Sequence, residues 1–426
     1  MTQVDLIVLL LAAVVALGVA ARWLRLAYPI LLVVGGLLLS LQPWAPRYEL
    51  PPQVIMLVFL PPLLYAAAFN TEWRAFRTQL RAISLLAVGL VAFTTVLVAA
   101  ACHYLLDFPW PVGFVLGAIV SPPDAVAATA ITQRIKVPRI VATILDGESL
   151  VNDASALVLY KLAIAAALSG AVAWWEVGYQ FVFVGVGGVA VGLIGAVAMV
   201  ELHSFLERRG LADAKITITL TLLTPYFVYL PAEHLHVSGV LAAVAAGLWV
   251  GSRCERVFTH DLYTEARAVW EMVEFVLNGL IFILIGFQLP LILEGLTASA
   301  IDVGRLSVAA AAISGVVIAA RILWVFPGAY LPRWVDRVVG RGDPYPAWQN
   351  VMVVAWTGMR GVVSLAAAMA LARDFPHRHE VLFLTFWVIF ATLVGQGLTL
   401  PLLIRMLGVD RRAEAEELVE AEQVSC

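Results

Sequence analysis

The eight residues Asp146-Gly-Glu-Ser-Leu-Val-Asn-Asp153 place three carboxylates in a stretch that is apolar on both sides. On a helix, Asp146, Ser149 and Asp153 share one face, and Glu148 and Asn152 form a neighbouring stripe. Oxygen ligands suit hard cations, and a carboxylate withdrawn from water also holds its proton more firmly. Such a group can bind a cation or a proton but not both at once. The run therefore predicts coupled movement of the two, with a structural polar network as the alternative.

A second stretch, Ser121-Pro-Pro-Asp124, interrupts an apolar segment with two consecutive prolines. Proline lacks a backbone N–H and clashes with the preceding turn, so the helix is predicted to break there. At membrane depth such a break is tolerated only where it lines a cavity or is buried in protein. Asp124 then begins the second half-helix, at a position typical of an N-cap. The alternative is a kink that Asp124 caps without any other role.

A third stretch, Trp356-Thr-Gly-Met-Arg-Gly361, combines two helix-weakening glycines with a fixed positive charge at Arg360. A buried charge needs a partner, because an unpaired one is strongly destabilising. Glu148 is the natural candidate and Asp153 the alternative, and the arginine could also serve only to hold two helices together. Three further charges inside predicted spans have no role that the sequence assigns: Asp146, Glu274 and Arg321.

The 426-residue chain is 62% hydrophobic and only 13% charged, whereas soluble domains are about half apolar and about a quarter charged. This composition excludes nucleic-acid binders, secreted disulfide scaffolds and soluble enzymes, and three widely spaced cysteines indicate no disulfide framework and no zinc site. A helix needs about 20 apolar residues to cross a bilayer. The sequence therefore predicts an all-α polytopic membrane protein with about thirteen spans, at residues 4–21, 28–42, 51–69, 82–106, 111–132, 138–168, 174–200, 214–231, 237–250, 267–293, 303–330, 347–372 and 379–407.

Basic residues gather on alternate loops, and cytoplasmic loops are those that carry an excess of Lys and Arg. The odd-numbered loops and the tail hold 20 of the 27 basic residues, and the even-numbered loops hold four. We therefore predict an N-terminus outside, without a removable signal peptide, and a C-terminus in the cytoplasm. The residues that assign the cytoplasmic side are Arg22, Arg25, Arg74, Arg77, Arg81, Arg134, Lys136, Arg139, Arg208, Arg209, Lys215, Arg253, Arg256, Arg267, Arg333, Arg337, Arg341, Arg405, Arg411 and Arg412.

The span order also predicts internal symmetry. If spans one to six and eight to thirteen are two repeats, the odd span between them makes the six-helix repeats inverted. The interrupted spans 111–132 and 347–372 then occupy equivalent positions, and their discontinuous helices are predicted to cross at the midplane, the usual place of a transporter ion site. A glycine-rich run at 185–192 has the spacing of close helix contacts, within the bundle in preference to a dimer face.

Taken together, Ser121-Pro-Pro-Asp124, Gly147-Glu-Ser-Leu-Val-Asn-Asp153 and Gly358-Met-Arg-Gly361 resemble the monovalent cation/proton antiporter family, of the sodium/hydrogen-exchanger type. The resemblance covers essentially the whole membrane chain, residues 1–407. It implies a homodimer in which a six-helix core moves to give alternating access. The implied core is about 82–168 and 303–407, the implied dimerisation scaffold is about 1–69 and 174–293, and residues 408–426 form a short acidic cytoplasmic tail.

The resemblance also implies roles for individual residues. By motif match, Asp153 resembles the essential ion- and proton-binding aspartate, Asp124 the discontinuous-helix aspartate, and Ser149 a ligand hydroxyl, so that these three would hold Na⁺. Glu148 and Arg360 resemble the structural ion pair of the family.

Two neighbouring positions bear on stoichiometry and selectivity. Asn152 stands where electrogenic relatives carry a second aspartate, and the Asn-Asp form is associated with exchange of one cation for one proton. Many members have Thr-Asp-Pro at the first break, whereas this chain has Pro123-Asp124-Ala125. The threonine hydroxyl is missing, and the Pro123 carbonyl is the oxygen expected to face the site in its place.

We therefore expect a secondary antiporter of the bacterial inner membrane that exchanges Na⁺, or Li⁺ or K⁺, for H⁺, with cation and proton competing for Asp153. The expected role is pH and sodium homeostasis, without a cofactor or nucleic-acid partner. A carrier of another small solute on the same scaffold is the main alternative. An intramembrane serine protease would need a Gly-x-Ser-x-Gly motif, and a channel would need a repeated filter loop; the sequence contains neither.

Overall fold

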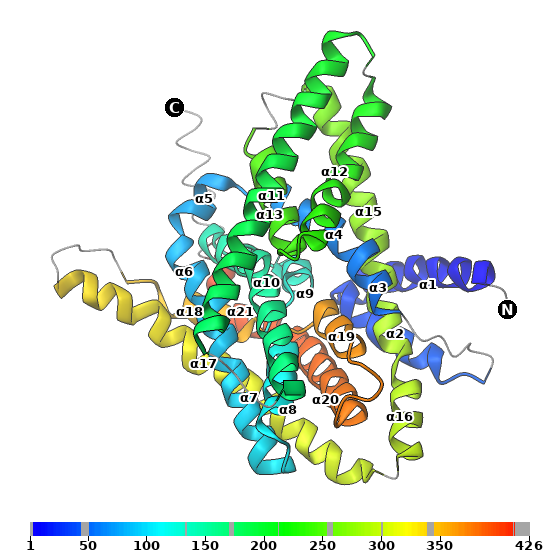
Figure 1. Cartoon of the computed structure of the whole chain (residues 1–426), viewed down its shortest axis with the longest axis vertical. Helices are drawn as coiled ribbons and strands as arrows, with labels where there is room; N and C mark the ends of the chain where they lie inside the picture. The colour runs from blue at the N-terminus through cyan, green and yellow to red at the C-terminus, as the bar shows by residue number, and fades with distance from the viewer. Residues whose placement is uncertain are drawn as a thin grey trace.

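The computed structural model describes residues 3–43, 51–132, 134–169, 174–211, 213–253, 259–299, 301–338, 345–411 and 413, and every regular element in these ranges is helical. The all-α prediction is therefore confirmed for the described part of the chain. Most of the acidic tail, residues 414–426, lies outside the described residues. Figure 1 shows the helices as a bundle from which α1 and the C-terminal part of α17 project in opposite directions.

Each predicted span coincides with one helix or with a group of consecutive helices. Eight helical stretches among the described residues are long and apolar enough to cross a bilayer, and α2, α8 and α13 are shorter apolar helices. The count of thirteen and the inverted repeats stay predictions. In chain order the elements are α1 (Gln3–Leu24), α2 (Tyr28–Ser40), α3 (Pro52–Val54), α4 (Leu60–Phe69), α5 (Trp73–Thr78), α6 (Leu80–Ser84), α7 (Val91–Leu106), α8 (Trp110–Val120), α9 (Ala125–Thr132), α10 (Arg139–Ser169), α11 (Trp174–Arg208), α12 (Ala214–His234), α13 (Gly239–Gly251), α15 (His260–Phe287), α16 (Leu289–Ala298), α17 (Val303–Val338), α18 (Trp348–Trp356), α19 (Val362–Met369), α20 (Arg378–Phe390) and α21 (Gly397–Met406), with π-helical segments at Ile55–Phe59, Leu85–Leu90 and Ala391–Gln396.

Two apolar segments are split into half-helices, as the sequence predicts. The first ends α8 at Val120 and begins α9 at Ala125, because the prolines between them have no N–H to continue the helical hydrogen bonds. The second ends α18 at Trp356 and begins α19 at Val362. The 31-residue helix α10 runs unbroken beside them and contacts α8, α9, α18 and α19.

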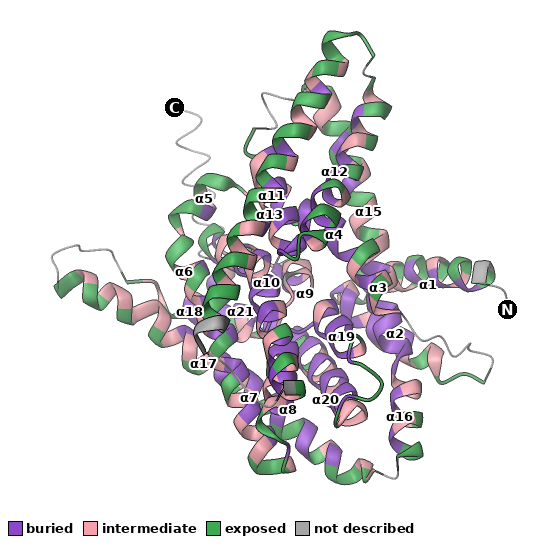
Figure 2. Ribbon diagram, in the orientation of Figure 1, coloured by how far each residue is buried: buried purple, intermediate pink, exposed green. Residues whose placement is uncertain are grey.

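The buried apolar side chains form two clusters. The larger joins α1 and α2 to the broken helices and to α15, α17, α20 and α21, and the smaller joins α4, α12 and α13. Figure 2 shows burial concentrated around α10, α19 and α20, whereas α1 and α11 are mostly exposed. Long, exposed and apolar helices are expected where a protein faces lipid or another copy of itself. The division into core and scaffold stays a prediction.

The glycine-rich run packs within the chain, as expected. A side chain at Gly188 or Gly192 would collide with the backbone oxygen of Ser238 or Ala242 on α13, and one at Gly187 would strike Val237. These glycines therefore let α11 and α13 approach closely.

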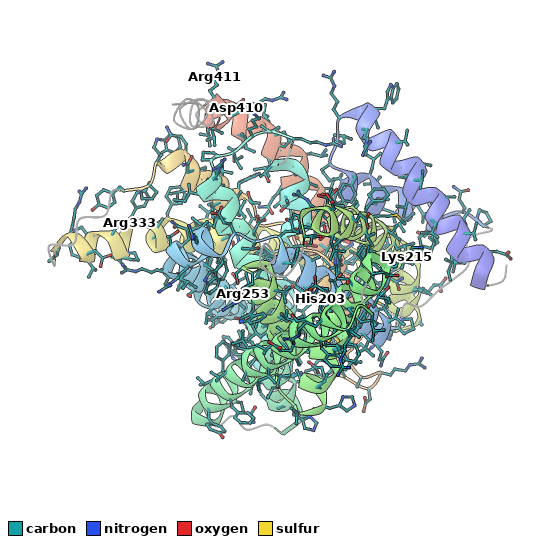
Figure 3. All side chains as sticks on the ribbon, turned by 90° about the horizontal axis from the view of Figure 1, so that it is seen from above. His203, Lys215, Arg253, Arg333, Asp410 and Arg411 are labelled. Carbon is teal, nitrogen blue, oxygen red and sulfur yellow. The ribbon has the colours of Figure 1, made fainter. Side chains whose placement is uncertain are left out.

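Charged residues of the loops and helix ends lie at the periphery. Seen from above, Arg333 stands on the projecting end of α17, and Asp410 and Arg411 extend from the end of the last helical segment (Figure 3). The interior charges are confined to a few helices, and they define the candidate site.

Candidate functional site

The two helix breaks contact each other directly. The backbone N–H of Asp124 donates to the carbonyl of Met359 at 2.7 Å, and Nε of Arg360 donates to the carbonyl of Val120 at 2.7 Å. Val120 is the last residue of α8, so its carbonyl has no partner within the helix. The predicted meeting of the two interrupted segments is therefore confirmed, and each break satisfies backbone groups that the other leaves open.

The carboxylate of Asp124 caps two half-helices at once. It accepts hydrogen bonds from the N–H of Val126 in α9, at 2.8 Å, and from the N–H of Val362 in α19. Both groups belong to helix N-termini, whose partial positive charge stabilises an anion. A Cβ at Gly361 would lie 1.7 Å from Oδ2 of Asp124, so only glycine leaves room for this carboxylate.

Asp153 lies beside the place where the two helix breaks meet, here called the helix crossing. Its environment differs from that of Asp124. Its side chain is 7% exposed and close enough to Asp124 for the two charges to interact. In the described part of the chain, no side-chain or backbone group donates a hydrogen bond to its carboxylate. Ser149 lies one turn earlier on the same face of α10 and is half-buried. Asp153 is thus the carboxylate of the crossing that keeps its oxygens available.

Asn152 ties α10 to the first break. Its Nδ2 donates to the carbonyl of Pro123 at 2.9 Å, and its Oδ1 is buried without a partner among the described residues. The Pro123 carbonyl, expected to face the ion, is thus already an acceptor for this amide. The unpartnered oxygen beside Asp153 is the amide oxygen of Asn152.

The predicted pairing of Glu148 with Arg360 is wrong, and so is the alternative pairing with Asp153. Glu148 instead forms a two-pronged ion pair with Arg321 of α17, with N–O distances of 2.6 and 2.7 Å, and each side chain is 1% exposed. Nε of Arg321 also donates to the carbonyl of Val354, at 3.0 Å. The planar guanidinium matches both carboxylate oxygens, which makes this pair both strong and directional.

Among the described residues, the side chain of Arg360 donates to backbone carbonyls and not to a carboxylate. Besides Val120, it donates through Nη1 to the carbonyl of Gly358 at 2.5 Å, and its own N–H donates to Oγ1 of Thr392 at 3.0 Å. Its Nη2 is buried without a partner among the described residues. The free carbonyls at the end of α8 form the negative end of a helix dipole, which accounts for a cation at this place.

Two other interior carboxylates lie apart from the crossing. Asp146 accepts a hydrogen bond from Oγ1 of Thr129 at 3.2 Å and lines a cavity of about 250 Å³ together with Lys136. Glu274 is half-buried on α15. Tyr28 lies within electrostatic range of both Glu274 and Asp124. The proximity of Tyr28 and Thr129 to these carboxylates could not be predicted from the sequence, because both resemble ordinary residues at the end of a span.

The donor set suits a hard cation. Among the described residues no three His, Cys, Asp or Glu side chains are grouped as transition-metal ligands would be. The crossing offers two carboxylates and neutral oxygens, which are the ligands of hard cations. One of the carboxylates is fixed by two backbone donors and the other has none, so the site can trade a cation for a proton at Asp153.

The chain matches the family model for the sodium/hydrogen exchanger, transmembrane, over residues 8–406. An uncharacterized Na(+)/H(+) exchanger of Mycobacterium tuberculosis is 35% identical over 407 residues, which are 94% of this chain and 73% of the relative. A sodium, potassium, lithium and rubidium/H(+) antiporter of Bacillus subtilis is 32% identical over 417 residues, and the match covers 94% of this chain and 61% of that protein.

A solved structure shares the fold. The sodium proton antiporter MjNhaP1 from Methanocaldococcus jannaschii superposes with a TM-score of 0.68 at 19% identity, over 95% of this chain and 98% of that one. This similarity concerns the fold alone.

The buried ion pair generates a stability prediction. Replacing Glu148 by glutamine leaves the charge of Arg321 buried without compensation, and we expect the free energy of unfolding to fall by about 3–5 kcal/mol. The double variant Glu148→Gln/Arg321→Met removes both charges and should recover most of that loss. The free energy of unfolding of the wild type and of both variants can be measured by SDS-induced unfolding in mixed micelles.

The matched control is Glu271→Gln, which breaks the exposed pair between Arg267 and Glu271. It should lie within about 1 kcal/mol of the wild type. A Glu148→Gln protein as stable as this control would show that the buried pair does not stabilise the fold.

Proposed function

Because this chain belongs to the sodium/hydrogen exchanger family, we propose that it exchanges a monovalent cation, Na⁺ in the first place, for a proton across the membrane. The observation that carries the proposal is the asymmetry between the two carboxylates at the helix crossing. Asp124 is held by two backbone N–H groups, whereas Asp153 has no donor in the described chain. A cation and a proton therefore compete for Asp153, with Asp124 and Ser149 as further ligands.

The same arrangement supports electroneutral exchange. Glu148 and Arg321 neutralise each other, and Arg360 donates to the carbonyls of Val120 and Gly358. Asn152 carries no charge and Asp124 accepts from backbone N–H groups, so we assign the exchanged proton to Asp153 alone. One carboxylate can release one proton for each cation that it binds, which leaves no net charge to move.

The way the breaks are joined supports a proposal of alternating access. Hydrogen bonds tie α8 and α9 to α18 and α19, and Asn152 ties α10 to the first break. We propose that these helices move as one body against the scaffold helices and carry the site from one side of the membrane to the other. The function belongs to the bacterial inner membrane, with the N-terminus outside and the C-terminus in the cytoplasm.

Homodimerisation completes the proposal. Only 17% of the most apolar stretch of α11 is buried within the chain, and only 22% of that of α1. Such surfaces are suited to lipid and to a second copy of the chain. A fixed scaffold pair would give the moving core a support in the membrane.

The central prediction concerns Asp153. In proteoliposomes that contain a pH-sensitive dye, pulses of Na⁺, Li⁺ or K⁺ should collapse an imposed pH gradient with the wild-type protein. Asp153→Asn should abolish this flux, because an amide can neither release a proton nor neutralise the cation.

The surface variant Glu201→Gln removes the same charge from α11 and should transport normally, which makes it the matched control. If no monovalent cation moves protons in folded wild-type protein between about pH 6 and about pH 9, the antiporter proposal fails. Flux that persists in Asp153→Asn assigns the exchange to another residue.

A second prediction tests the competition and the stoichiometry. As pH falls, the cation must displace a proton, so the apparent KM for Na⁺ should rise about tenfold per pH unit below the pKa of the binding carboxyl. Current recording from the same vesicles on a solid support should show no net charge movement during active exchange. A sustained current, or a KM that does not change with pH, argues against one-for-one exchange at a shared carboxylate.

A third prediction concerns the space at Gly361. An alanine there must displace the Asp124 carboxylate by more than 1 Å, because its Cβ would otherwise lie 1.7 Å from Oδ2. We expect kcat/KM for the cation to fall roughly tenfold to a hundredfold, as for other displacements of about 1 Å at an active centre. Gly315→Ala on α17, where a Cβ meets nothing within 4 Å, is the control and should transport normally. Equal activity of the two variants would contradict the assigned position of Asp124.

A further inference from the structure

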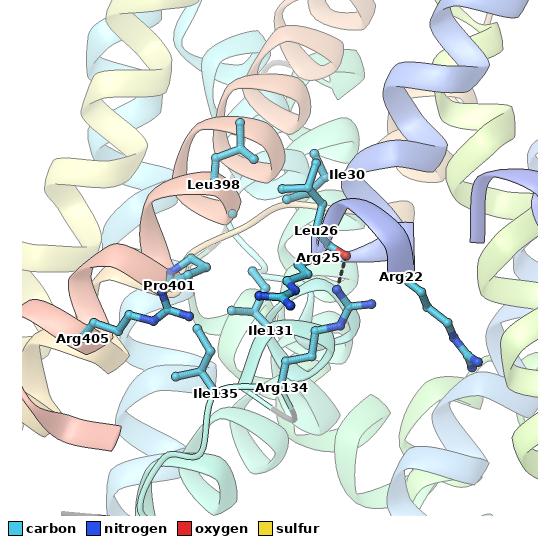
Figure 4. A pocket seen from close by; sticks show the side chains of 12 residues that line it. Arg22, Arg25, Leu26, Ile30, Ile131, Arg134, Ile135, Leu398, Pro401 and Arg405 are labelled. Carbon is cyan, nitrogen blue, oxygen red and sulfur yellow. Dashed lines mark hydrogen bonds between the residues drawn. The ribbon is translucent and has the colours of Figure 1, made fainter. Parts of the chain in front are cut away.

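A cavity away from the helix crossing is lined with arginines. It measures about 520 Å³ and is bounded by the α1–α2 connection, by the end of α9 and by α21. Arg22, Arg25, Arg134 and Arg405 line it, and none of its lining residues is acidic. In Figure 4, the guanidinium groups of Arg25, Arg134 and Arg405 approach the cavity, whereas that of Arg22 turns away.

No carboxylate in the described chain neutralises this cluster. The ion pairs of the described residues involve other arginines and lysines, and none includes one of these four. Arg134 donates to the carbonyl of Leu26, which ties the end of α9 to the α1–α2 connection (Figure 4). The four arginines keep their full charge, since guanidinium does not lose its proton in proteins.

Helix ends explain only part of this charge. Arg22 and Arg405 lie in the last turns of α1 and α21, and Arg134 follows α9, so each is near a helix C-terminus. Each helix end carries about half a negative charge, and three ends offset less than half of four positive charges. The excess of positive charge in one concave space is what an anion requires.

The position of Arg25 follows from the end of α1. Its φ of 57° is the left-handed conformation common just after a helix, and the N–H of Leu26 donates to the carbonyl of Ala21 to close that helix end. The side chain of Arg25 extends from this turn toward the cavity (Figure 4).

We propose that this cavity binds a phosphate-bearing anion, through Arg25, Arg134 and Arg405. Arginine forks match phosphate oxygens in pairs, and basic pockets between membrane helices on the cytoplasmic side hold anionic headgroups. The walls are apolar at Ile30, Ile131 and Leu398, so they accept the glycerol and first methylenes of a phospholipid as well as a free phosphate. A bound phosphate would join the α1–α2 connection to α9 and α21, which belong to the scaffold and the core of the proposed function.

The test measures binding without transport. The full-length protein in detergent is heated while its tryptophan fluorescence is followed, in the presence of phosphatidylglycerol, phosphatidylcholine, inorganic phosphate or chloride. The cation and the ionic strength are matched throughout, because the cation itself binds at Asp153 under the proposed function. We expect phosphatidylglycerol to raise Tm by about 3 °C or more and phosphatidylcholine to leave it unchanged.

The variant Arg25→Asn/Arg405→Ala should lose this shift, whereas Arg411→Ala, which removes a peripheral arginine (Figure 3), should keep it. Asparagine accepts the left-handed backbone at position 25, so the single variant Arg25→Asn serves if the double variant does not fold. The increase in Tm that phosphatidylglycerol gives should be smaller for Arg25→Asn than for the wild type.

The outcomes separate the two sources of phosphate and the two proposals. A shift with phosphatidylglycerol alone identifies a lipid headgroup, and an equal shift with inorganic phosphate identifies a soluble phosphate ligand. A shift that chloride or phosphatidylcholine also gives, or that survives in Arg25→Asn/Arg405→Ala, overturns the proposal, as does the absence of any shift. Asp153→Asn should keep the shift, so failure of the exchange mechanism and failure of this site give different results.

Discussion

A chain that breaks its helices inside a bilayer must satisfy the freed backbone groups without water, and the candidate site depends on this constraint. The open end of α8 presents carbonyls, and Arg360 of the other break donates to one of them. The new ends of α9 and α19 present N–H groups, and Asp124 accepts from both. Each break therefore satisfies backbone groups that the other exposes, and the carboxylate and guanidinium that do so are two of the charges of the candidate site.

At the helix crossing, Asp153 is the charged group that has no hydrogen-bond or ion-pair partner among the described residues. The buried pair of Glu148 and Arg321 uses both carboxylate oxygens and holds α10 to α17. The amide nitrogen of Asn152 donates to the Pro123 carbonyl, and its uncharged oxygen has no partner among the described residues. Asp153, which accepts no hydrogen bond from the described chain, is therefore the group to which the proposed function assigns both the proton and the cation.

The local features of this site could be predicted from the sequence, and the long-range pairings could not. The two prolines before Asp124 remove backbone donors from the helix, and the spacing of Ser149 and Asp153 fixes their common face, so both inferences need only neighbouring residues. The partner of Glu148 depends instead on where α17 packs, 173 positions along the chain. Arg360 stands in the more conspicuous motif, yet its side chain donates to the backbone carbonyls of Val120 and Gly358. A buried cation needs acceptors, and sequence alone does not show whether they come from side chains or from a broken helix.

The short helix α9 links the crossing to the arginine-lined cavity. Its eight residues span about 12 Å, with Asp124 at its N-terminus and Arg134 just beyond its C-terminus. Both charges agree with the helix dipole, so the helix is stabilised at each end by an opposite charge. A rigid element this short cannot shift at one end without shifting at the other. An anion that holds Arg134 to the α1–α2 connection therefore restrains the helix that positions Asp124, and releasing it frees the same helix to move with the crossing.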